Sequence, residues 1–253
     1  MRFDVITLFP ELFTAQLRLG VTRRAFESGR VDVHLWPLRE HADEPHRRVD
    51  DRPFGGGPGM VMLVEPLERA LEAVRHARAE GAVVAPLVHF SPTGRRIDQA
   101  LVQEFARGPG AVLLCGRYEG IDQRFIDRHV DIELSLGDFV LSGGELPAMA
   151  LLDAVARLQD GVLGDAQSHQ QDSFSDGLLD CPHYSRPELL PGDAGVSAVP
   201  AVLMSGHHAQ VARWRRERSL ELTARRRPDL LAAARAAGRL SPVDESFIKS
   251  LGL

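Results

Sequence analysis

The sequence predicts an α/β protein with a mostly parallel sheet, followed by a smaller and mostly helical domain. Strand-like apolar runs alternate with helical patterns from residue 1 to about residue 160, which is typical of parallel sheets crossed by helices. Glycine-rich turns follow two of these runs. The chain has 253 residues and is 44% hydrophobic, so it is long enough to bury a full core.

The elements can be followed in order along the chain. Strand-like runs cover residues 3–9, 31–36, 82–90, 111–115 and 131–134. Helical patterns cover residues 66–78, 98–107 and 146–159. Residues 161–180 are polar and poor in apolar anchors, which predicts a mobile linker or lid. Short helical patterns follow it, with Pro228 and Pro242 at plausible first-turn positions.

Composition excludes several classes of protein. Only Cys115 and Cys181 occur, too few for a disulfide framework and without the Cys/His spacing of a zinc site, so we expect no metal centre. The N-terminus lacks the apolar run of a signal sequence and no membrane-spanning stretch follows, which predicts a cytoplasmic protein without a membrane partner. The net charge of −5 argues against a general nucleic-acid coat protein.

Arginines are concentrated late in the chain. All basic residues but Lys249 are arginine, and the dense set is Arg213, Arg215, Arg216, Arg218, Arg225, Arg226 and Arg227. The planar guanidinium suits phosphates and base edges. From the residues alone this run predicts either RNA contact or a solvated helix face.

Three loops are expected to line one pocket. The stretch Cys115-Gly116-Arg117-Tyr118-Glu119-Gly120 follows one strand-like run, and residues 136–147 follow another. We expect these turns at the ends of neighbouring strands, where α/β sheets place ligands. Ser91-Pro92-Thr93-Gly94 is expected to form a third turn at the same edge.

Other candidate motifs have simpler interpretations. Gly55-Gly56-Gly57-Pro58-Gly59-Met60 lacks the Gly-Lys-Ser/Thr ending of a P-loop, which favours a flexible substrate-side loop. Asp50 and Asp51 are adjacent and typical of solvated or salt-paired acids. Asp153 and Arg157 have the spacing of a surface ion pair. His207-His208 lacks a ligand partner at the right spacing, and Asp172 in a polar linker is ordinarily a solvated acid or a helix cap.

Longer motifs change the interpretation of Arg157 and Asp172. They are residues 51–60, residues 114–122, residues 136–147 and Gly177-Leu178-Leu179-Asp180-Cys181-Pro182-His183-Tyr184. Together they resemble the bacterial tRNA (guanine-N1)-methyltransferases, the TrmD family of the SPOUT class. The match continues in order through Arg213-Trp214-Arg215 and residues 227–231, so it covers nearly the whole chain.

The resemblance implies more than the pattern can. It implies a trefoil-knotted domain that binds S-adenosylmethionine (residues 1–163), an interdomain linker or lid (164–177) and a helical tRNA-binding domain (178–253). It also implies a homodimer with active sites shared between subunits. The substrate would be tRNA with a guanosine at position 37, directly 3′ of the anticodon.

The implied chemistry needs a base, because guanine N1 carries a hydrogen at neutral pH. By resemblance, Asp172 removes this proton and Arg157 stabilises the negative charge that builds on O6. Whether a divalent ion such as Mg²⁺ assists is left open, with Glu119 as its candidate contact. The linker carboxylate would then be ordered only when the correct RNA binds.

By resemblance, the donor is held by Pro92, Gly116, Glu119, Leu136, Gly137, Asp138, Phe139, Val140, Leu141, Gly143, Gly144 and Pro147. The tRNA is held by Gly55, Gly59, Arg213, Arg215 and Arg216. Phe54 and Phe139 stand where the family often has tyrosine, so both positions keep the aromatic ring and lose the hydroxyl.

Two alternatives stay open. A knotted methyltransferase acting on another RNA position, such as a ribose hydroxyl, would not need a base matched to guanine N1. A non-catalytic RNA-binding protein with this fold would bind tRNA and transfer no methyl group.

Overall fold

The computed structural model describes residues 1–79, 84–164, 171–192 and 195–252. These residues form two compact units, Met1–Ala166 and Gln167–Leu253, each with its own core. Of the predicted linker, residues 164–177, the part from 165 to 170 lies outside the described residues. No described helix is both long and apolar enough to cross a membrane.

The first unit is built on a parallel sheet. Its five strands among the described residues are β1 (Arg2–Thr7), β2 (Asp32–Pro37), β5 (Leu87–Arg96), β6 (Gly110–Leu114) and β7 (Ile132–Ser135). They pair in the order β2-β1-β6-β5-β7, and every pairing is parallel. This confirms the predicted parallel α/β sheet, and the strand boundaries lie within a few residues of the expected ones except at β5.

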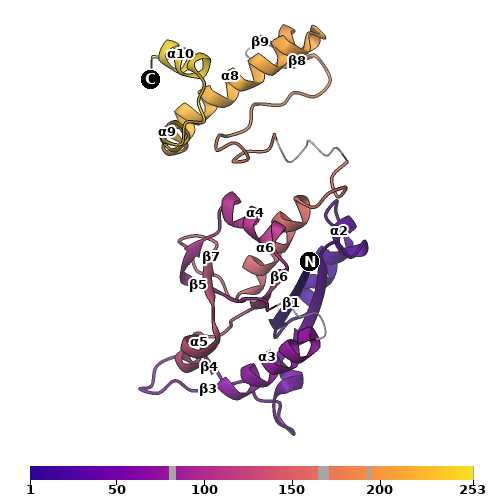
Figure 1. Cartoon of the computed structure of the whole chain (residues 1–253), viewed down its shortest axis with the longest axis vertical. Helices are drawn as coiled ribbons and strands as arrows, with labels where there is room; N and C mark the ends of the chain where they lie inside the picture. The colour runs from indigo at the N-terminus through magenta and orange to yellow at the C-terminus, as the bar shows by residue number, and fades with distance from the viewer. Residues whose placement is uncertain (80–83, 165–170, 193–194, 253) are drawn as a thin grey trace. The chain divides into compact units, whose positions relative to one another are not determined.

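Helices cover both faces of this sheet (Figure 1). One face packs on α1 (Glu11–Arg18), α2 (Arg23–Glu27), α4 (Gln99–Arg107) and α6 (Glu145–Arg157). The other packs on α3 (Val64–Ala79), α5 (Gln123–His129) and the 3₁₀ turn η1 (Leu38–His41). β6 shows how the sequence makes this possible: Ala111 and Leu113 join the first core, whereas Val112 and Leu114 join the second. A strand buried on both faces is apolar throughout.

Two expectations about the strands are wrong. The strands that precede the two glycine-rich turns, β6 and β7, are not neighbours, because β5 lies between them. Ser91–Gly94 is also no turn after a strand: it lies within β5, where the pairing with β7 shifts register between Phe90 and Arg95. At Gly94 a Cβ would overlap the backbone nitrogen of Leu134, so glycine permits the close approach of β5 to β7.

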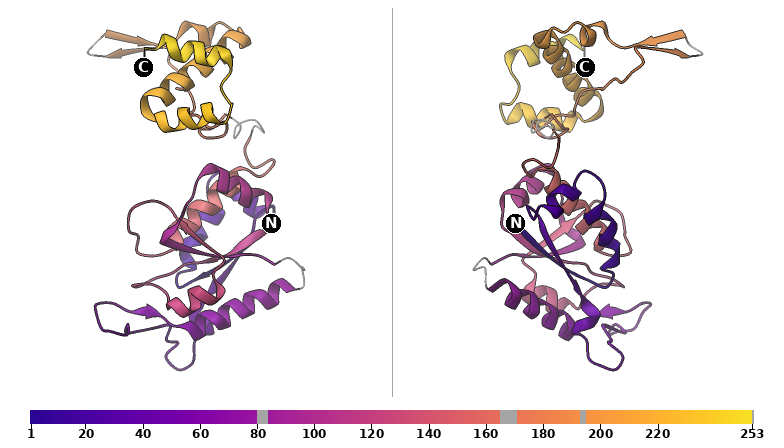
Figure 2. Two further views of the ribbon diagram at one scale, coloured as in Figure 1. Left: turned by 60° about the vertical axis from the view of Figure 1, so that its left-hand side comes forward. Right: turned by 90° about the vertical axis from the view of Figure 1, so that its right-hand side faces the viewer.

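The second unit is mainly helical. It contains α7 (Ala201–Met204), α8 (His208–Arg226), α9 (Pro228–Ala236) and α10 (Pro242–Ser250). Pro228 and Pro242 begin α9 and α10, as predicted, and Ser241 caps α10 through a capping box with Asp244. A hairpin of β8 (Leu189–Gly192) and β9 (Gly195–Ala198), which the sequence pattern did not predict, projects from these helices (Figure 2).

A small antiparallel pair, β3 (Asp50–Asp51) and β4 (Val61–Met62), carries the glycine loop of residues 55–59 at its tip. β4 is tied to the sheet edge, since Met62 N donates to Gly120 O (2.9 Å) and Glu119 N donates to Met60 O (2.9 Å). Asp51 forms an ion pair with Arg48, as expected for a salt-paired acid. The glycine loop is therefore anchored beside the turn that follows β6.

Candidate active site

The loops after β6 and β7 meet around a cavity of about 240 Å³ at the carboxyl end of the sheet. Gly144 N donates to Gly116 O (2.9 Å), which joins the two glycine-rich turns directly. A Cβ on Gly144 would lie 2.8 Å from the Cα of Cys115, so only glycine allows this approach. The cavity predicted from the two turns exists even though their strands are not neighbours.

Eleven of the twelve residues expected around the methyl donor line this cavity. They are Pro92, Gly116, Glu119, Leu136, Gly137, Phe139, Val140, Leu141, Gly143, Gly144 and Pro147. Asp138 is not among the lining residues, and its carboxylate forms an ion pair with Arg96. The β5 bulge brings Pro92 to the cavity without the predicted turn.

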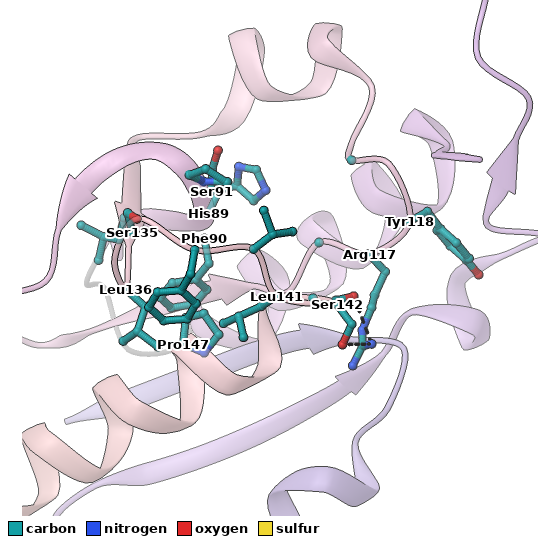
Figure 3. Close-up of a pocket in the computed structure, with 18 of the residues that line it drawn as sticks. His89, Phe90, Ser91, Arg117, Tyr118, Ser135, Leu136, Leu141, Ser142 and Pro147 are labelled. Carbon is teal, nitrogen blue, oxygen red and sulfur yellow. Dashed lines mark hydrogen bonds between the residues drawn. The ribbon is translucent and has the colours of Figure 1, made fainter. Parts of the chain in front are cut away.

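The cavity has an apolar side and a polar side (Figure 3). Phe90, Leu136, Leu141 and Pro147 gather on the apolar side, and Arg117 points toward Ser142 on the other. Arg117 Nη1 donates to the carbonyl of Ser142 at 3.2 Å. Such a cavity suits a ligand with a flat apolar ring and a polar tail.

Arg117 is fixed by a buried carboxylate. Its Nε donates to Glu145 Oε2 (2.8 Å), and Thr7 Oγ1 donates to Glu145 Oε1 (2.8 Å). The Glu145 side chain is only 1% exposed, and it lies in the first turn of helix α6, where a negative charge is favoured. The guanidinium also lies over the Phe9 ring, 4.6 Å from its centroid. These contacts connect β1, the turn after β6 and α6 at the cavity wall.

His89 is a buried residue of the cavity lining that the sequence reasoning missed. Burial lowers the pKa of its imidazole, and the opposing effect of Glu133, whose Oε1 lies 3.3 Å from Nδ1, is smaller. The ring is therefore neutral near pH 7. Its position near the end of a predicted strand gave no sign that it lines the cavity, because side chains of a buried strand ordinarily pack in the core.

Cys115 is buried behind the cavity, and burial together with the charge of Glu145 raises the pKa of its thiol well above the ordinary value. Thiolates, not thiols, are nucleophiles. Cys115 thus has a structural place in the core.

The two residues expected to be catalytic belong to different units. Arg157 is the last residue of α6 in the first unit, and Asp153, one turn earlier, accepts a hydrogen bond from Thr22 Oγ1 (2.9 Å). Asp172 lies in the second unit, where it lines a second cavity of about 260 Å³ with Arg215 and Arg216 of α8.

The residues expected to bind tRNA are spread over both units. Gly55 is at the tip of the β3–β4 pair, and the side chain of Glu119 fills the space beside Gly59, where a Cβ would overlap its carboxylate. Arg213 Nε donates to Glu217 (2.9 Å) on the exposed face of α8. Arg216 is bound by Asp176 (2.5 Å) and Asp244 (3.0 Å), so it also holds the second unit together.

Comparison with known proteins identifies one family. The family described as tRNA (guanine-1)-methyltransferase TrmD matches residues 1–233. A tRNA (guanine-N(1)-)-methyltransferase of Leptothrix cholodnii is 73% identical over 253 residues, covering 100% of both chains. The protein with the same description from Methylibium petroleiphilum is 72% identical over 99% of this chain and 98% of its own. That of Bordetella pertussis is 57% identical, with the same coverage.

Proposed function

The chain belongs to the TrmD family of tRNA (guanine-N1)-methyltransferases, and we propose that it methylates N1 of guanosine 37, directly 3′ of the anticodon, with S-adenosylmethionine as donor. The observation that carries this proposal is the cavity between the loops after β6 and β7, which is lined by eleven of the twelve residues expected around the donor. Because the proposed substrate is tRNA, we propose that the protein acts in the cytoplasm.

The lining residues fit the proposed donor. Phe90, Leu134 and Leu141 offer apolar surface to an adenine ring, and the glycines let backbone amides and carbonyls approach the ribose. His89, Ser91 and Ser135 add neutral hydrogen-bonding groups at the wall. When bound, the donor supplies a methyl group on a positively charged sulfur, and the protein's main contribution is orientation.

The acceptor side of the reaction belongs to Asp172 and Arg157 in this proposal. Asp172 removes the proton from guanine N1, and the guanidinium of Arg157 stabilises the negative charge that develops on O6. The structural support for Asp172 is its place in the lining of the second cavity, together with Arg215 and Arg216 of α8. Residues 164–177, between the donor-binding domain (1–163) and the tRNA-binding domain (178–253), would serve as the lid that carries it.

We propose a homodimer in which each active site takes residues from both subunits. The support is a set of exposed apolar side chains: Phe139 and Val140 of the cavity lining, Val140 to 89%, and Phe9, Leu12 and Leu146. Exposed apolar patches of this kind mark interfaces. In a dimer, the Asp172 of one subunit would act at the donor cavity of the other.

The trefoil knot of the SPOUT class is also part of the proposal. Its support is the return of the chain after β7 to the turn after β6, where Gly144 N and Gly116 O are hydrogen-bonded. A knot is an exception to the rule that chains do not thread their own loops.

For tRNA we propose contacts from the glycine loop at Gly55 and Gly59 and from Arg213, Arg215 and Arg216. Phe54 beside the loop is 99% exposed, which leaves its ring open to a nucleotide even without a tyrosine hydroxyl. The α8 arginines would supply the positive surface that the phosphates of tRNA need.

The deciding experiment is transfer of labelled methyl from S-adenosylmethionine to an unmodified tRNA transcript with guanosine 37, comparing wild type with Asp172→Asn. We expect 1-methylguanosine from the wild type and its loss in the variant with donor binding intact. Methylation of a ribose instead, or none by a wild type that binds donor, would refute the proposal. Repeating the assay with Mg²⁺ and with a chelator decides whether a divalent ion contributes.

A further inference from the structure

A second cavity, of about 260 Å³, offers room for a nucleobase. It lies wholly within the second unit, between the segment 171–181 and one face of α8. Its polar lining comprises Gln171, Asp172, Asp176, Asp180, Arg215, Arg216 and Ser219.

The wall of this cavity is held firmly. Leu179 N donates to Thr223 Oγ1 (2.9 Å), and Ser219 Oγ donates to the carbonyl of Leu179 (2.5 Å). The neighbouring Leu178 is buried in the core of the second unit with Leu220. Leu178 and Leu179 are therefore fixed to two successive turns of α8 at the wall of the cavity.

Most charged side chains around the cavity form ion pairs or hydrogen bonds with other groups of the protein. Asp176 is paired with Arg216, and Asp180 accepts hydrogen bonds from Cys181 N (2.6 Å) and the His183 ring (2.7 Å). Arg215 differs: within the part of the chain that the structure describes, no ion pair involves it. Its guanidinium is an exposed, fork-shaped donor on the cavity wall.

Guanine matches a wall that carries both an arginine and a carboxylate. Its O6 and N7 are two acceptors on one edge, which a guanidinium binds bidentately, and its N1 carries a hydrogen that a carboxylate accepts. Adenine has an amino group in place of O6, which would face the guanidinium donor to donor. The arrangement therefore selects guanine.

We propose that this cavity binds the target guanine, with Arg215 donating to O6 and N7 while Asp172 accepts the N1 hydrogen. This rests on the proposed function and assigns Arg215 a role in base recognition instead of phosphate binding. The second lone pair of O6 remains for Arg157. Arg216, by contrast, holds the wall through Asp176 and Asp244.

The test uses two tRNAs that differ only at the target, one with guanosine and one with 7-deazaguanosine, which lacks the N7 acceptor but keeps N1. Wild type should lose about fivefold in kcat/KM on the deaza substrate, as expected for one hydrogen bond. Arg215→Ala should lose about tenfold or more on guanosine and show no further loss on the deaza substrate. Arg213→Ala, a change on the same helix, should affect both tRNAs equally and keep the wild-type discrimination.

Thermal unfolding and donor binding of Arg215→Ala should equal those of the wild type, which separates lost recognition from misfolding. Equal wild-type rates on the two tRNAs, or a deaza effect that persists in Arg215→Ala, would overturn the inference and leave the proposed function standing. A wild type that fails to methylate the guanosine tRNA would overturn both.

Discussion

Arg117 Nε and Glu145 Oε2 are 2.8 Å apart and join the turn after β6 to the first turn of α6. The carboxylate is fully enclosed, whereas the guanidinium reaches the cavity surface. This pair holds the two loops of the proposed donor cavity in register, because Arg117 lies in the turn after β6 and Glu145 begins the helix that follows the loop after β7.

Arg117→Met should therefore destabilise the protein. A buried carboxylate left without its partner costs about 3 kcal/mol in free energy of unfolding. Urea denaturation measures the loss. The double variant Arg117→Met/Glu145→Gln removes the stranded charge and should recover most of it; a double variant as unstable as the single one would contradict this account.

Asp4 should make stability depend on acid pH. Burial opposes its ionisation, but hydrogen bonds from Arg2, Trp36 and Arg78 outweigh burial and lower the pKa below the ordinary 3.8. The stabilisation is thus fully present above the unfolded pKa and is lost as the pH falls from that value toward the folded pKa. Asp4→Asn should cost about 3 kcal/mol at pH 7.

Comparing urea unfolding at pH 7 and pH 3 tests whether the stabilisation by Asp4 is lost in acid. The difference between wild type and Asp4→Asn should shrink at pH 3. Asp32→Asn, an exposed acid on the neighbouring strand, is the matched control and should cost less than about 1 kcal/mol at both values. A difference that grows in acid would refute the assignment.

Gly144→Ala should weaken donor binding about tenfold or more, since its Cβ would lie 2.8 Å from the backbone of Cys115 and force the loops apart. Calorimetric titration with S-adenosylmethionine measures the affinity. Gly164→Ala is the control, because a Cβ there meets nothing within 4 Å. Wild-type affinity in Gly144→Ala would contradict this prediction and show that the loops accommodate the added Cβ.

Arg216→Ala should lower the stability of the second unit by about 2 kcal/mol, because it removes charged hydrogen bonds to Asp176 and to the nearly buried Asp244. Arg215→Ala should change it by less than about 0.5 kcal/mol. Hydrogen exchange of α8 and α10 amides reports this unit separately. Equal protection in the two variants would show that Arg216 is not structural.

Binding of tRNA should depend strongly on salt, with a linear fall of log affinity against log salt concentration. Arg215→Ala/Arg216→Ala should weaken tRNA binding and leave S-adenosylmethionine affinity unchanged, because the residues proposed to bind the donor lie in the other unit. Filter binding across a salt series checks both statements. An equal loss of tRNA and donor affinity would refute the assignment of these arginines.

The local patterns in the sequence predicted the elements well and their arrangement less well. Alternation of apolar residues located the strands, and Pro228 and Pro242 located two helix starts, because these signals act within a few residues. The order β2-β1-β6-β5-β7 depends on contacts between distant segments, which periodicity does not contain. The hairpin β8–β9 was missed because its Leu189, Leu190 and Val196 are exposed and lack an alternating pattern.

The candidate site was likewise predictable where local motifs define it and unpredictable where distant contacts do. The glycine-rich motifs indicated a backbone-lined cavity, and family resemblance supplied the residues around it. The contact of Thr7 with Glu145 spans 138 residues of sequence, and no motif connects them. The arginine run could be sorted only in part from the sequence. Arg213 has Glu217 four residues later on the same helix, whereas folding brings the distant acids Asp176 and Asp244 to Arg216.

The junction of Gly116 with Gly144 bears on how this enzyme could be inhibited. A compound that takes its hydrogen bonds from main-chain groups in the turns after β6 and β7 would depend little on side chains that mutation can alter. Replacing Gly144 itself would push apart the loops that line the proposed donor site. Drug resistance at this point would therefore cost the cell its own methylation activity.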